Sequence, residues 1–421
     1  MSAAVVQTSA WYPPFQTGGT EVYLEGLVEE LAGLGIDSAV VLPRPSDAPQ
    51  TYVHGGTPVF TYPLRESSRD LSAFEALLCA HPGATYHQHS WTPDCGADHL
   101  AIARRLGMPT VLTIHTPNAI CLSGTMMRFE SDPCDGRIDP AQCAPCWAQS
   151  RGAPIGLAKA LGCLPSLPIT PPGRLGTALS ARAQVRRRQG DFAAMIAAAD
   201  RIVVVCGWLH AALTANGVPA EKLVPSRQGL SHNFLQTALK ARCDVRQAGP
   251  LRLLYLGRWH PVKGIDVVVR ALRALPQLDV SLAIHAVDGG EEEAACRRAV
   301  EALIGDDPRI VVAGPAKRAD VSRTLAQADV LVVPSTWLET GPMVALEAMA
   351  VGTFVLGSDI GGLAELIDTP EKGALVAKGD PAAWGRAISA MVDCPPRRTA
   401  HAVRTMAEVA ADMANLYASL R

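Results

Sequence analysis

Two glutamates, Glu339 and Glu347, carry the clearest chemistry of the chain, and seven residues separate them within the stretch 330–367. Ionised carboxylates accept hydrogen bonds and can take both hydroxyls of a diol. The pair therefore suits the hydroxyl groups of a sugar or a ribose, with Glu339 at the mouth of a site and Glu347 deeper. The alternative is that both glutamates are solvated charges, one on a loop and one on a helix surface.

The backbone between these glutamates is a candidate anion site. A short apolar run that ends at Pro334 predicts a buried strand, and we expect a loop and a helix to follow it. Gly341 and Pro342 stand where that helix would begin, because proline is tolerated at the first helical position. The first amide groups of a helix point outward and bind phosphate. We therefore expect the main chain from Gly341 through Met343 to Val344 to bind a phosphorylated ligand.

A second group of candidate residues is basic. Arg258 and Lys263 lie on one short stretch that follows an apolar strand, and Gly257 and Gly264 bracket them. A guanidinium and an ammonium on one loop suit a diphosphate, whose negative charge grows as it leaves. The alternative is two solvated bases. No G-x-G-x-x-G motif follows this strand, which argues against a dinucleotide-dependent dehydrogenase.

Four cysteines, Cys121, Cys134, Cys143 and Cys146, lie within 26 residues. Cys143 and Cys146 form a C-x2-C pair, the spacing that lets two thiolates bind one tetrahedral ion, so the four predict a structural zinc site. His115 could substitute for one thiolate. Free thiols, a disulfide and an iron–sulfur cluster remain as alternatives.

Glycines and histidines mark the ends of two predicted strands in the first half of the chain. Gly18 and Gly19 precede an amphipathic stretch, where paired glycines let a ligand approach a helix N-terminus. The alternative is a simple glycine turn. His87 and His89 end one predicted strand, and His115 ends another, so we expect all three histidines to enter the same cleft as the glycines.

The elements that must position these residues alternate between strand and helix. Apolar, β-branched runs such as AAVVQTS, PTVLTIH, LRLLYLG and VLVVPS are separated by helix-like stretches, which favours parallel, doubly wound sheets. With 421 residues, two domains are expected. The stretch 116–200 exceeds an ordinary connection and is expected to be an insertion with structure of its own, part of it proline-rich.

Composition excludes several classes of function. The 38 basic and 40 acidic residues nearly balance, so we expect no nucleic-acid partner. No run reaches the roughly 18 apolar residues of a membrane span, and no leader pattern is visible, so we expect a cytoplasmic protein. Arg186–Arg188 could contact an anionic acceptor or the inner face of the membrane, or could lie on a solvated helix face.

The stretch PSTWLETGPMVALEAMAVGTFVLGSDIGGLAELI resembles the donor-site signature of the family-4 retaining glycosyltransferases of the GT-B fold, also called group 1. The resemblance implies that Glu339 contacts the donor sugar and that Glu347 holds the ribose of the nucleotide. It also implies that Arg258 and Lys263 stabilise the leaving diphosphate, and that His115 lies near the donor sugar.

The same resemblance implies an α/β architecture of two Rossmann-like, doubly wound domains that face each other across a cleft. We expect an acceptor-side domain of residues 1–241, which includes the insertion and is joined by the C-terminal helix 405–421. Residues 242–404 would form the donor domain, preceded by a polar linker. In the family pattern, Gly18 and Gly19 close over the diphosphate and Gly314–Arg318 line the nucleobase pocket.

The function implied is transfer of a sugar from a nucleoside diphosphate sugar to a glycan, a glycolipid or a small-molecule acceptor. The chemistry requires no metal ion, because bases and a helix N-terminus stabilise the leaving group. The alternatives are a phosphorylase or a nucleotide-sugar epimerase on the same fold, and a non-catalytic nucleotide-sugar sensor. A donor panel would separate them, since only a transferase hydrolyses or transfers the sugar.

Overall fold

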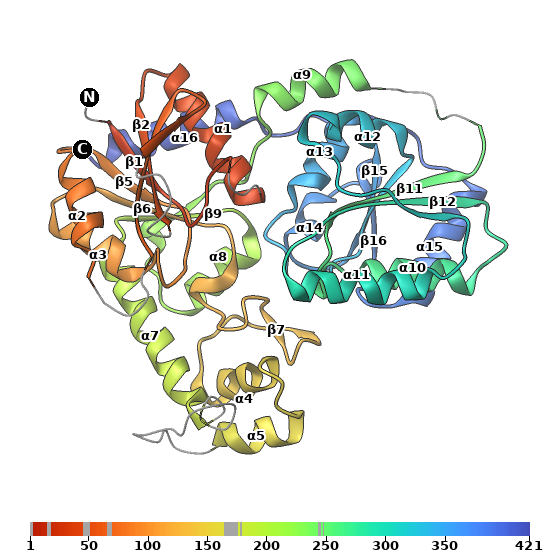
Figure 1. Cartoon of the computed structure of the whole chain (residues 1–421), viewed down its shortest axis with the longest axis horizontal. Helices are drawn as coiled ribbons and strands as arrows, with labels where there is room; N and C mark the ends of the chain where they lie inside the picture. The colour runs from red at the N-terminus through yellow and green to blue at the C-terminus, as the bar shows by residue number, and fades with distance from the viewer. Residues whose placement is uncertain are drawn as a thin grey trace. The chain divides into compact units, whose positions relative to one another are not determined.

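The computed structural model describes residues 3–14, 18–44, 51–64, 70–163, 176, 179–242, 246 and 248–421, with only the main chain at 161–163. The chain forms two compact units. The first comprises Met1–Gln228 and Met406–Arg421, and the second comprises Gly229–Thr405. Each unit is built on its own parallel sheet (Figure 1).

The sheet of the first unit has eight strands in the order β10-β9-β6-β5-β1-β2-β4-β3. The pairs are parallel except at the edge, where β3 runs antiparallel to β4. The central strands are buried on both faces, as their continuous apolar runs predict. The bounds are β1 Val5–Thr8, β2 Ser38–Arg44, β3 Thr51–His54, β4 Thr57–Pro63, β5 Thr85–Gln88, β6 Thr110–Ile114, β9 Arg201–Val204 and β10 Leu223–Pro225.

Helices cover this first sheet. Helix α1 (Gly19–Gly33) and helix α16 (Met406–Ser419) pack together, and their buried side chains share one core cluster with strand residues such as Val5 and Val111. The others are α2 (Ser72–Cys79), α3 (Ala97–Arg105), α7 (Ala181–Ala198) and α8 (Gly207–Ala215), with the short turn η2 (Ala220–Lys222). Helix α16 therefore completes the core of the first unit although it follows the second unit in the chain.

The insertion between β6 and β9 carries its own small structure at the end of α7 that lies away from the sheet (Figure 1). It contains the turn η1 (Pro117–Ala119), a hairpin of β7 (Met127–Arg128) and β8 (Asp132–Pro133), and the helices α4 (Pro140–Ser150) and α5 (Ile155–Cys163). A small apolar cluster joins α4, α5 and α7. The insertion ends in α7, and the predicted proline-rich part at 164–176 lies almost entirely outside the described residues.

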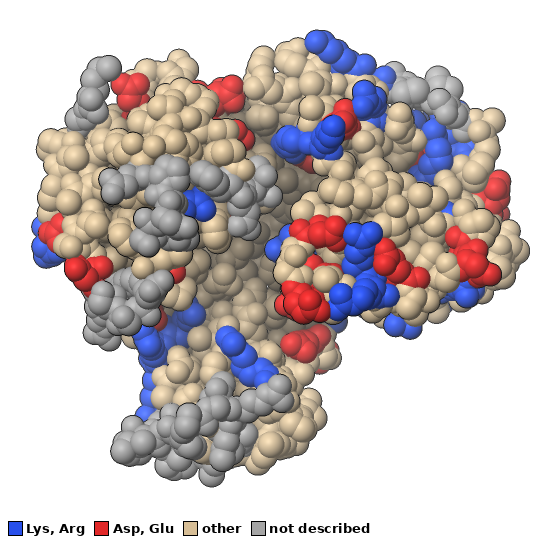
Figure 2. Space-filling view, viewed as in Figure 1, with Lys and Arg blue, Asp and Glu red and all other residues tan. Residues whose placement is uncertain are grey.

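The sheet of the second unit has six parallel strands in the order β13-β12-β11-β14-β15-β16. Their bounds are β11 Leu251–Arg258, β12 Val280–Val287, β13 Ile310–Val312, β14 Val330–Val333, β15 Phe354–Ser358 and β16 Gly373–Val376. On the face shown in Figure 2, basic and acidic side chains of this unit are interspersed. On α11 (Glu291–Ile304) they form ion pairs such as Arg298–Glu291 at 2.7 Å.

Two core clusters lie on the two faces of this second sheet. One joins the sheet to α10 (Ile265–Ala274), α11 and α15 (Pro381–Asp393). The other joins it to α9 (His232–Ala241), α12 (Val321–Gln327), α13 (Met343–Val351) and α14 (Gly361–Leu366). Helices on both faces make the unit doubly wound.

The predicted fold class, α/β with two Rossmann-like, doubly wound domains, is confirmed. The second unit begins at Gly229, whereas we expected the first domain to extend to residue 241. The reason is that Phe234 and Ala238 of α9 pack in a core cluster of the second unit. The predicted linker falls partly outside the described residues. Among the described helices, none is long and apolar enough to cross a membrane.

Candidate active site

The loops that follow β11 and β14 meet because these two parallel strands are neighbours in the second sheet. The amide of Thr336 donates to the carbonyl oxygen of Val262 at 2.8 Å. Gly264 has a φ of 67°, and a Cβ added there would lie 2.1 Å from the carbonyl oxygen of Pro334. Only glycine allows both this conformation and this approach, so Gly264 sets how closely the two loops pack.

The contact between these loops brings together Lys263 and Glu339. The Lys263 ammonium lies 2.6 Å from Glu339 Oε1, and the hydroxyl of Ser335 donates to the same oxygen at 2.8 Å. Lys263 also lies 5.3 Å from the centre of the Trp337 ring. Glu339 is only 6% exposed, so this is a buried ion pair rather than a surface one.

The charge state of Glu339 follows from these contacts. Burial by itself opposes ionisation of the carboxyl group. The positive charge of Lys263 and the hydrogen bonds from Lys263 and Ser335 outweigh burial, and they hold the pKa of Glu339 below its usual value. Glu339 is therefore a carboxylate at neutral pH, able to accept hydrogen bonds but not to donate them.

Two adjacent glycines at the start of α14 hold the main chain of Glu339. The amide of Gly362 donates to the carbonyl oxygen of Glu339 at 2.6 Å. A Cβ at Gly361 would lie 2.8 Å from that oxygen, and one at Gly362 would lie 2.7 Å from the carbonyl carbon of Thr340. We did not predict this role from the sequence, although the adjacent glycines after the strand at 354–358 were a visible signal.

Helix α13 begins at Met343, one residue later than predicted. Pro342 is its N-cap, with an extended backbone, and Gly341 precedes it with a φ of 132°. The amides of Met343 and Val344 have no acceptors within the helix and remain candidates for an anion, whereas the amide of Ala345 donates to the carbonyl oxygen of Pro342 at 3.0 Å. The predicted anion-binding main chain thus starts a helix at the carboxyl end of β14.

Glu347 lies on α13 and is buried, which agrees with its predicted deeper position. Glu339, which we expected at the mouth of the site, is buried as well. The guanidinium of Arg318, in the turn η4 (Arg318–Asp320), is bonded to the Glu347 carboxylate. Arg318 also lies 5.4 Å from the centre of the Phe234 ring. The loop that we predicted to line the nucleobase pocket therefore contacts Glu347, the residue predicted to bind the ribose, through Arg318.

Arg258 lies at the end of β11, on the same stretch as Lys263. Its side chain is exposed, while its carbonyl oxygen accepts a hydrogen bond from the hydroxyl of Tyr255 at 2.9 Å. A Cβ at Gly257 would lie 2.7 Å from that hydroxyl, which explains the glycine. Arg258 is thus positioned by the strand end but is not part of the buried ion pair.

In the first unit, Gly18 is the N-cap of α1 and Gly19 is its first residue, as the paired glycines predict. A Cβ at Gly18 would lie 2.7 Å from a carboxylate oxygen of Glu21, which is itself buried. His115 follows β6 and is 8% exposed, with its ring 4.7 Å from that of Tyr23 on α1. The glycines and His115 therefore lie on elements that pack together.

His87 and His89 do not open into a cleft as expected, because both are buried in the core. His87 is bonded to the hydroxyl of Tyr417 on α16 at 2.6 Å and to that of Thr113 at 2.7 Å. His89 lies 3.3 Å from His115 through ring nitrogens, and its Nε2 lies 2.8 Å from Gln7 Oε1. These contacts make His87 and His89 core residues that support β6 and α16.

The contact of His89 with Gln7 determines which ring nitrogens of His89 and His115 carry a proton. Gln7 Oε1 only accepts, so His89 donates from Nε2 and, as a neutral ring, accepts at Nδ1. His115 must then donate from its Nε2 to His89. Burial lowers the pKa of His115 to about 3, so the ring is neutral at physiological pH.

The remaining candidates lie in the insertion. The four predicted metal ligands, Cys121, Cys134, Cys143 and Cys146, line one pocket. Arg186 and Arg187 are exposed on α7, whereas Arg188 donates to the carbonyl oxygen of Asn118 at 2.6 Å and is partly buried. Arg188 is thus occupied within the insertion.

Two family models match this chain. One, described as glycosyl transferases group 1, matches residues 244–406, and one described as a glycosyl transferase 4-like domain matches residues 18–227. The chain belongs to the group 1 glycosyltransferases. The loops with Lys263 and Glu339 and the helix with Glu347 lie in the first match, and Gly18, Gly19 and His115 lie in the second.

Curated relatives of this group 1 glycosyltransferase match over part of their length. A D-inositol 3-phosphate glycosyltransferase of Xylanimonas cellulosilytica is 34% identical over 194 residues, which are 44% of this chain and 45% of that protein. The amylovoran biosynthesis glycosyltransferase AmsK of Erwinia amylovora is 30% identical over 212 residues, 49% of this chain and 50% of that protein. The matches thus span about half the length of these relatives.

Solved structures match over nearly the whole chain at low identity. Sucrose-phosphate synthase from Thermosynechococcus elongatus has a TM-score of 0.67 at 20% identity and covers 99% of this chain and 98% of that one. HepE from Anabaena, in complex with UDP and glucose, has a TM-score of 0.60 at 15% identity and covers 99% and 97%. These similarities establish the GT-B fold of this group 1 glycosyltransferase.

Proposed function

We propose that this glycosyltransferase moves a sugar from a nucleoside diphosphate sugar to a glycan, a glycolipid or a small-molecule acceptor, with retention of the anomeric configuration. The observation that carries the proposal is the buried Lys263–Glu339 pair, which lies at the carboxyl end of the second sheet. Parallel α/β sheets bind nucleotides at that end.

Lys263 suits a leaving diphosphate. An ammonium group has three N–H donors, and the bond to Glu339 uses one of them. The diphosphate gains negative charge as the glycosidic bond breaks, so a fixed cation stabilises the transition state more than the ground state. Arg258 and the N-terminus of α13 would add to this field. In this proposal, protein groups supply the charge stabilisation, and the reaction requires no divalent metal.

The two glutamates take different roles in the proposal. Glu339, a carboxylate held by Lys263 and Ser335, would accept hydrogen bonds from hydroxyls of the donor sugar. Glu347 would accept hydrogen bonds from the hydroxyl groups of the ribose. Its buried carboxylate is already paired with the guanidinium of Arg318. His115, whose ring is neutral because burial lowers its pKa, would lie near the donor sugar rather than bind a phosphate.

Similar proteins suggest which donors to test. HepE has been solved with UDP and with UDP-glucose, and starch synthase IV of Arabidopsis thaliana has been solved with ADP and acarbose. We therefore propose uridine and adenosine diphosphate sugars as the first donors. Inositol 3-phosphate, named for several relatives, is the first acceptor to test.

The test is a donor panel followed by a turnover assay. Each nucleoside diphosphate sugar is screened by the shift it causes in thermal unfolding, since a ligand at 100 times its dissociation constant stabilises the fold by about 2.7 kcal/mol. Donors that bind are then incubated with acceptors, and released nucleoside diphosphate is measured. Binding with neither hydrolysis nor transfer for every donor and acceptor tested would contradict the proposal.

A further inference from the structure

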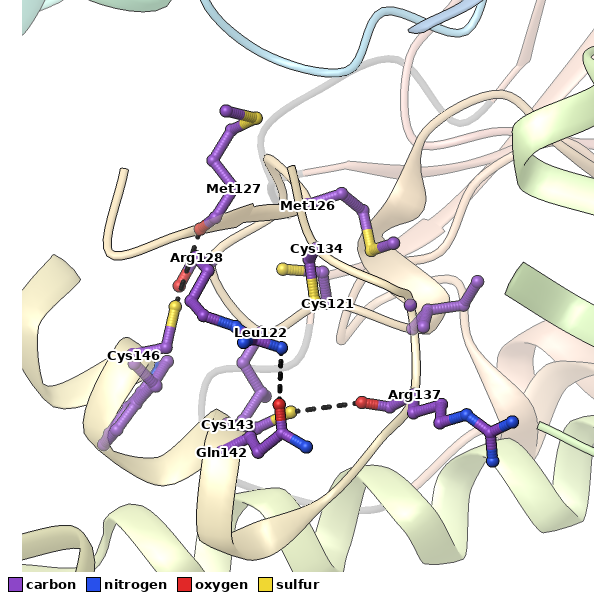
Figure 3. A pocket seen from close by; sticks show the side chains of 14 residues that line it. Cys121, Leu122, Met126, Met127, Arg128, Cys134, Arg137, Gln142, Cys143 and Cys146 are labelled. Carbon is purple, nitrogen blue, oxygen red and sulfur yellow. Dashed lines mark hydrogen bonds between the residues drawn. The ribbon is translucent and has the colours of Figure 1, made fainter. Parts of the chain in front are cut away.

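The insertion gathers four cysteines around one cavity, separate from the donor-side loops. Cys121 follows the turn η1, Cys134 follows β8, and Cys143 and Cys146 lie on α4 (Figure 3). The residues on α4 are three apart, so both project from the same side of the helix. Three separate segments of the insertion thus present thiols to a common space.

The hairpin in the segment that carries these thiols is short and has an unusual backbone. The hairpin strands β7 and β8 contain two residues each, and an isolated hairpin is at best marginally stable. Met126, Phe129 and Glu130 have φ values of 55°, 52° and 60°, a backbone region that is unfavourable for residues other than glycine. The apolar cluster of the insertion lies between α4, α5 and α7 rather than under the hairpin. A cross-link from the hairpin to α4 would offset this strain.

One backbone N–H group of the hairpin is directed at a sulfur atom. The amide of Phe129 donates to Cys146 Sγ at 3.4 Å. A thiol is a weak acceptor and a thiolate a strong one, so this bond would become stronger if Cys146 bound a metal as a thiolate.

The thiols of Cys146 and Cys143 point toward the main chain in this structure. The two thiols now donate to backbone carbonyls of Met127 and Arg137, each at 3.6 Å. Among the described residues, no three of histidine, cysteine, aspartate and glutamate are arranged to hold a metal ion. A metal would therefore have to turn these thiols toward Cys121 and Cys134.

We propose that Cys121, Cys134, Cys143 and Cys146 bind one zinc-type divalent ion that joins the hairpin to α4. The reaction is Zn²⁺ with four thiols giving a tetrathiolate site of charge −2 and four protons. Soft thiolate ligands select zinc over hard cations, and the guanidinium-bearing Arg128 and Arg137 line the same cavity and offset the negative charge. His115 is bonded to His89 in the core and is not a ligand.

The first experiment measures metal in the whole protein, purified without chelators. We expect one zinc per chain by elemental analysis, and proton release on reconstitution of the apoprotein with Zn²⁺. Replacement by Co²⁺ should give the visible absorption of a tetrahedral thiolate site with sulfur-to-metal charge-transfer bands. No stoichiometric metal, an iron–sulfur absorption, or a disulfide among the four cysteines in mass spectrometry would each overturn the proposal.

The second experiment uses matched variants. Cys143→Ser and Cys146→Ser should lower zinc content at least tenfold, because three thiolates bind zinc far more weakly than four. Cys79→Ser removes an exposed cysteine on α2 and should keep one zinc per chain. If the Cys143 and Cys146 variants retain full zinc content, the cysteines are not the ligands. The cobalt spectrum of the wild-type protein gives the same decision if a variant fails to fold.

Discussion

At the scale of single residues, the buried pair of Lys263 and Glu339 links stability to function. The two charges stabilise each other, because burying either charge without its partner would cost free energy of folding. The same ammonium is the group that we propose to bind the leaving diphosphate. Substitutions here must therefore separate loss of folding from loss of chemistry.

We predict that Lys263→Ala lowers turnover by about a hundredfold or more, the scale for loss of a fixed charge donor. It should also destabilise the protein by about 3–5 kcal/mol, because Glu339 keeps a buried charge without its partner. Steady-state kinetics and urea unfolding measure the two effects.

The double variant Lys263→Ala with Glu339→Gln provides the control for folding, since the amide leaves no buried charge. It should regain much of the stability and none of the turnover. Arg270→Ala, at an exposed ion pair on α10, should match the wild type in both measurements. Near-normal turnover in folded Lys263→Ala would refute the assigned role.

Substitutions of the two glutamates should have different effects on the affinity for nucleoside diphosphate. Glu347→Ala is expected to weaken binding of free nucleoside diphosphate by about tenfold or more, since a ribose contact is lost. Glu339→Ala is expected to keep most of that affinity and to impair sugar transfer. Isothermal calorimetry with the nucleoside diphosphate measures the difference, and equal losses in the two variants would contradict the split.

The buried histidines should make stability depend on pH. Burial lowers the pKa of His87 to about 3, while the unfolded side chain titrates near 6.5. Between these values the unfolded state binds more protons, so stability falls as the pH falls below 6.5 and is unaffected above it. Each such histidine contributes a slope of about 1.4 kcal/mol per pH unit.

Replacing His87 by glutamine should remove one such contribution. Urea unfolding at pH 7, 6 and 5 gives the slope for the wild type and for His87→Gln, and comparison of slopes cancels any constant loss of stability. A variant slope equal to that of the wild type would show that His87 is not held neutral in the folded state.

At the scale of elements, glycines decide how the loops of the donor side pack. Gly264 and Gly379 both have a φ of 67°, but only at Gly264 would a Cβ meet another group. Gly264→Ala should cost the backbone strain of about 1–3 kcal/mol and also displace the loop carrying Lys263, with a loss of turnover of at least tenfold.

Gly379 has the same φ, and a Cβ added there would meet nothing within 4 Å. Gly379→Ala therefore measures the cost of backbone strain without a steric clash. It should lose stability and keep turnover. The comparison is by thermal unfolding and by kinetics with the same donor. If the two variants lose turnover equally, close packing of Gly264 on Pro334 does not position Lys263.

The long apolar strands could be predicted from sequence because their side chains are buried on both faces, as in β6 and β11. The missed strands β3, β7 and β8 are exposed or only two residues long, so they carry no such pattern. The end of the first unit could not be predicted, because the amphipathic pattern of α9 does not show against which of the two sheets the helix packs.

The candidate site was predictable as two motifs but not as one cluster. Lys263 and Glu339 are 76 residues apart, and only the adjacency of β11 and β14 brings them together. The burial of both glutamates, the contact of Arg318 with Glu347 and the support from Gly361 and Gly362 likewise depend on packing. Composition and spacing identify chemical groups, whereas distances between them require the fold.

At the scale of the whole molecule, the family assignment leads to a stereochemical prediction. Group 1 membership and the resemblance to retaining enzymes predict that the product has the anomeric configuration of the donor. Proton NMR of the early reaction, before mutarotation or hydrolysis, measures the anomeric coupling constant. An inverted product would remove the retaining assignment while leaving glycosyl transfer intact.

Helix α16 has a consequence for how the protein is made. Its side chains complete a core cluster of the first unit, and Tyr417 is bonded to His87 of β5, yet a ribosome synthesises α16 only after the entire second unit. The apolar face of α1 therefore stays uncovered until the chain is nearly complete, whereas all residues of the second unit have by then been made. We expect the second unit to complete its fold before the first.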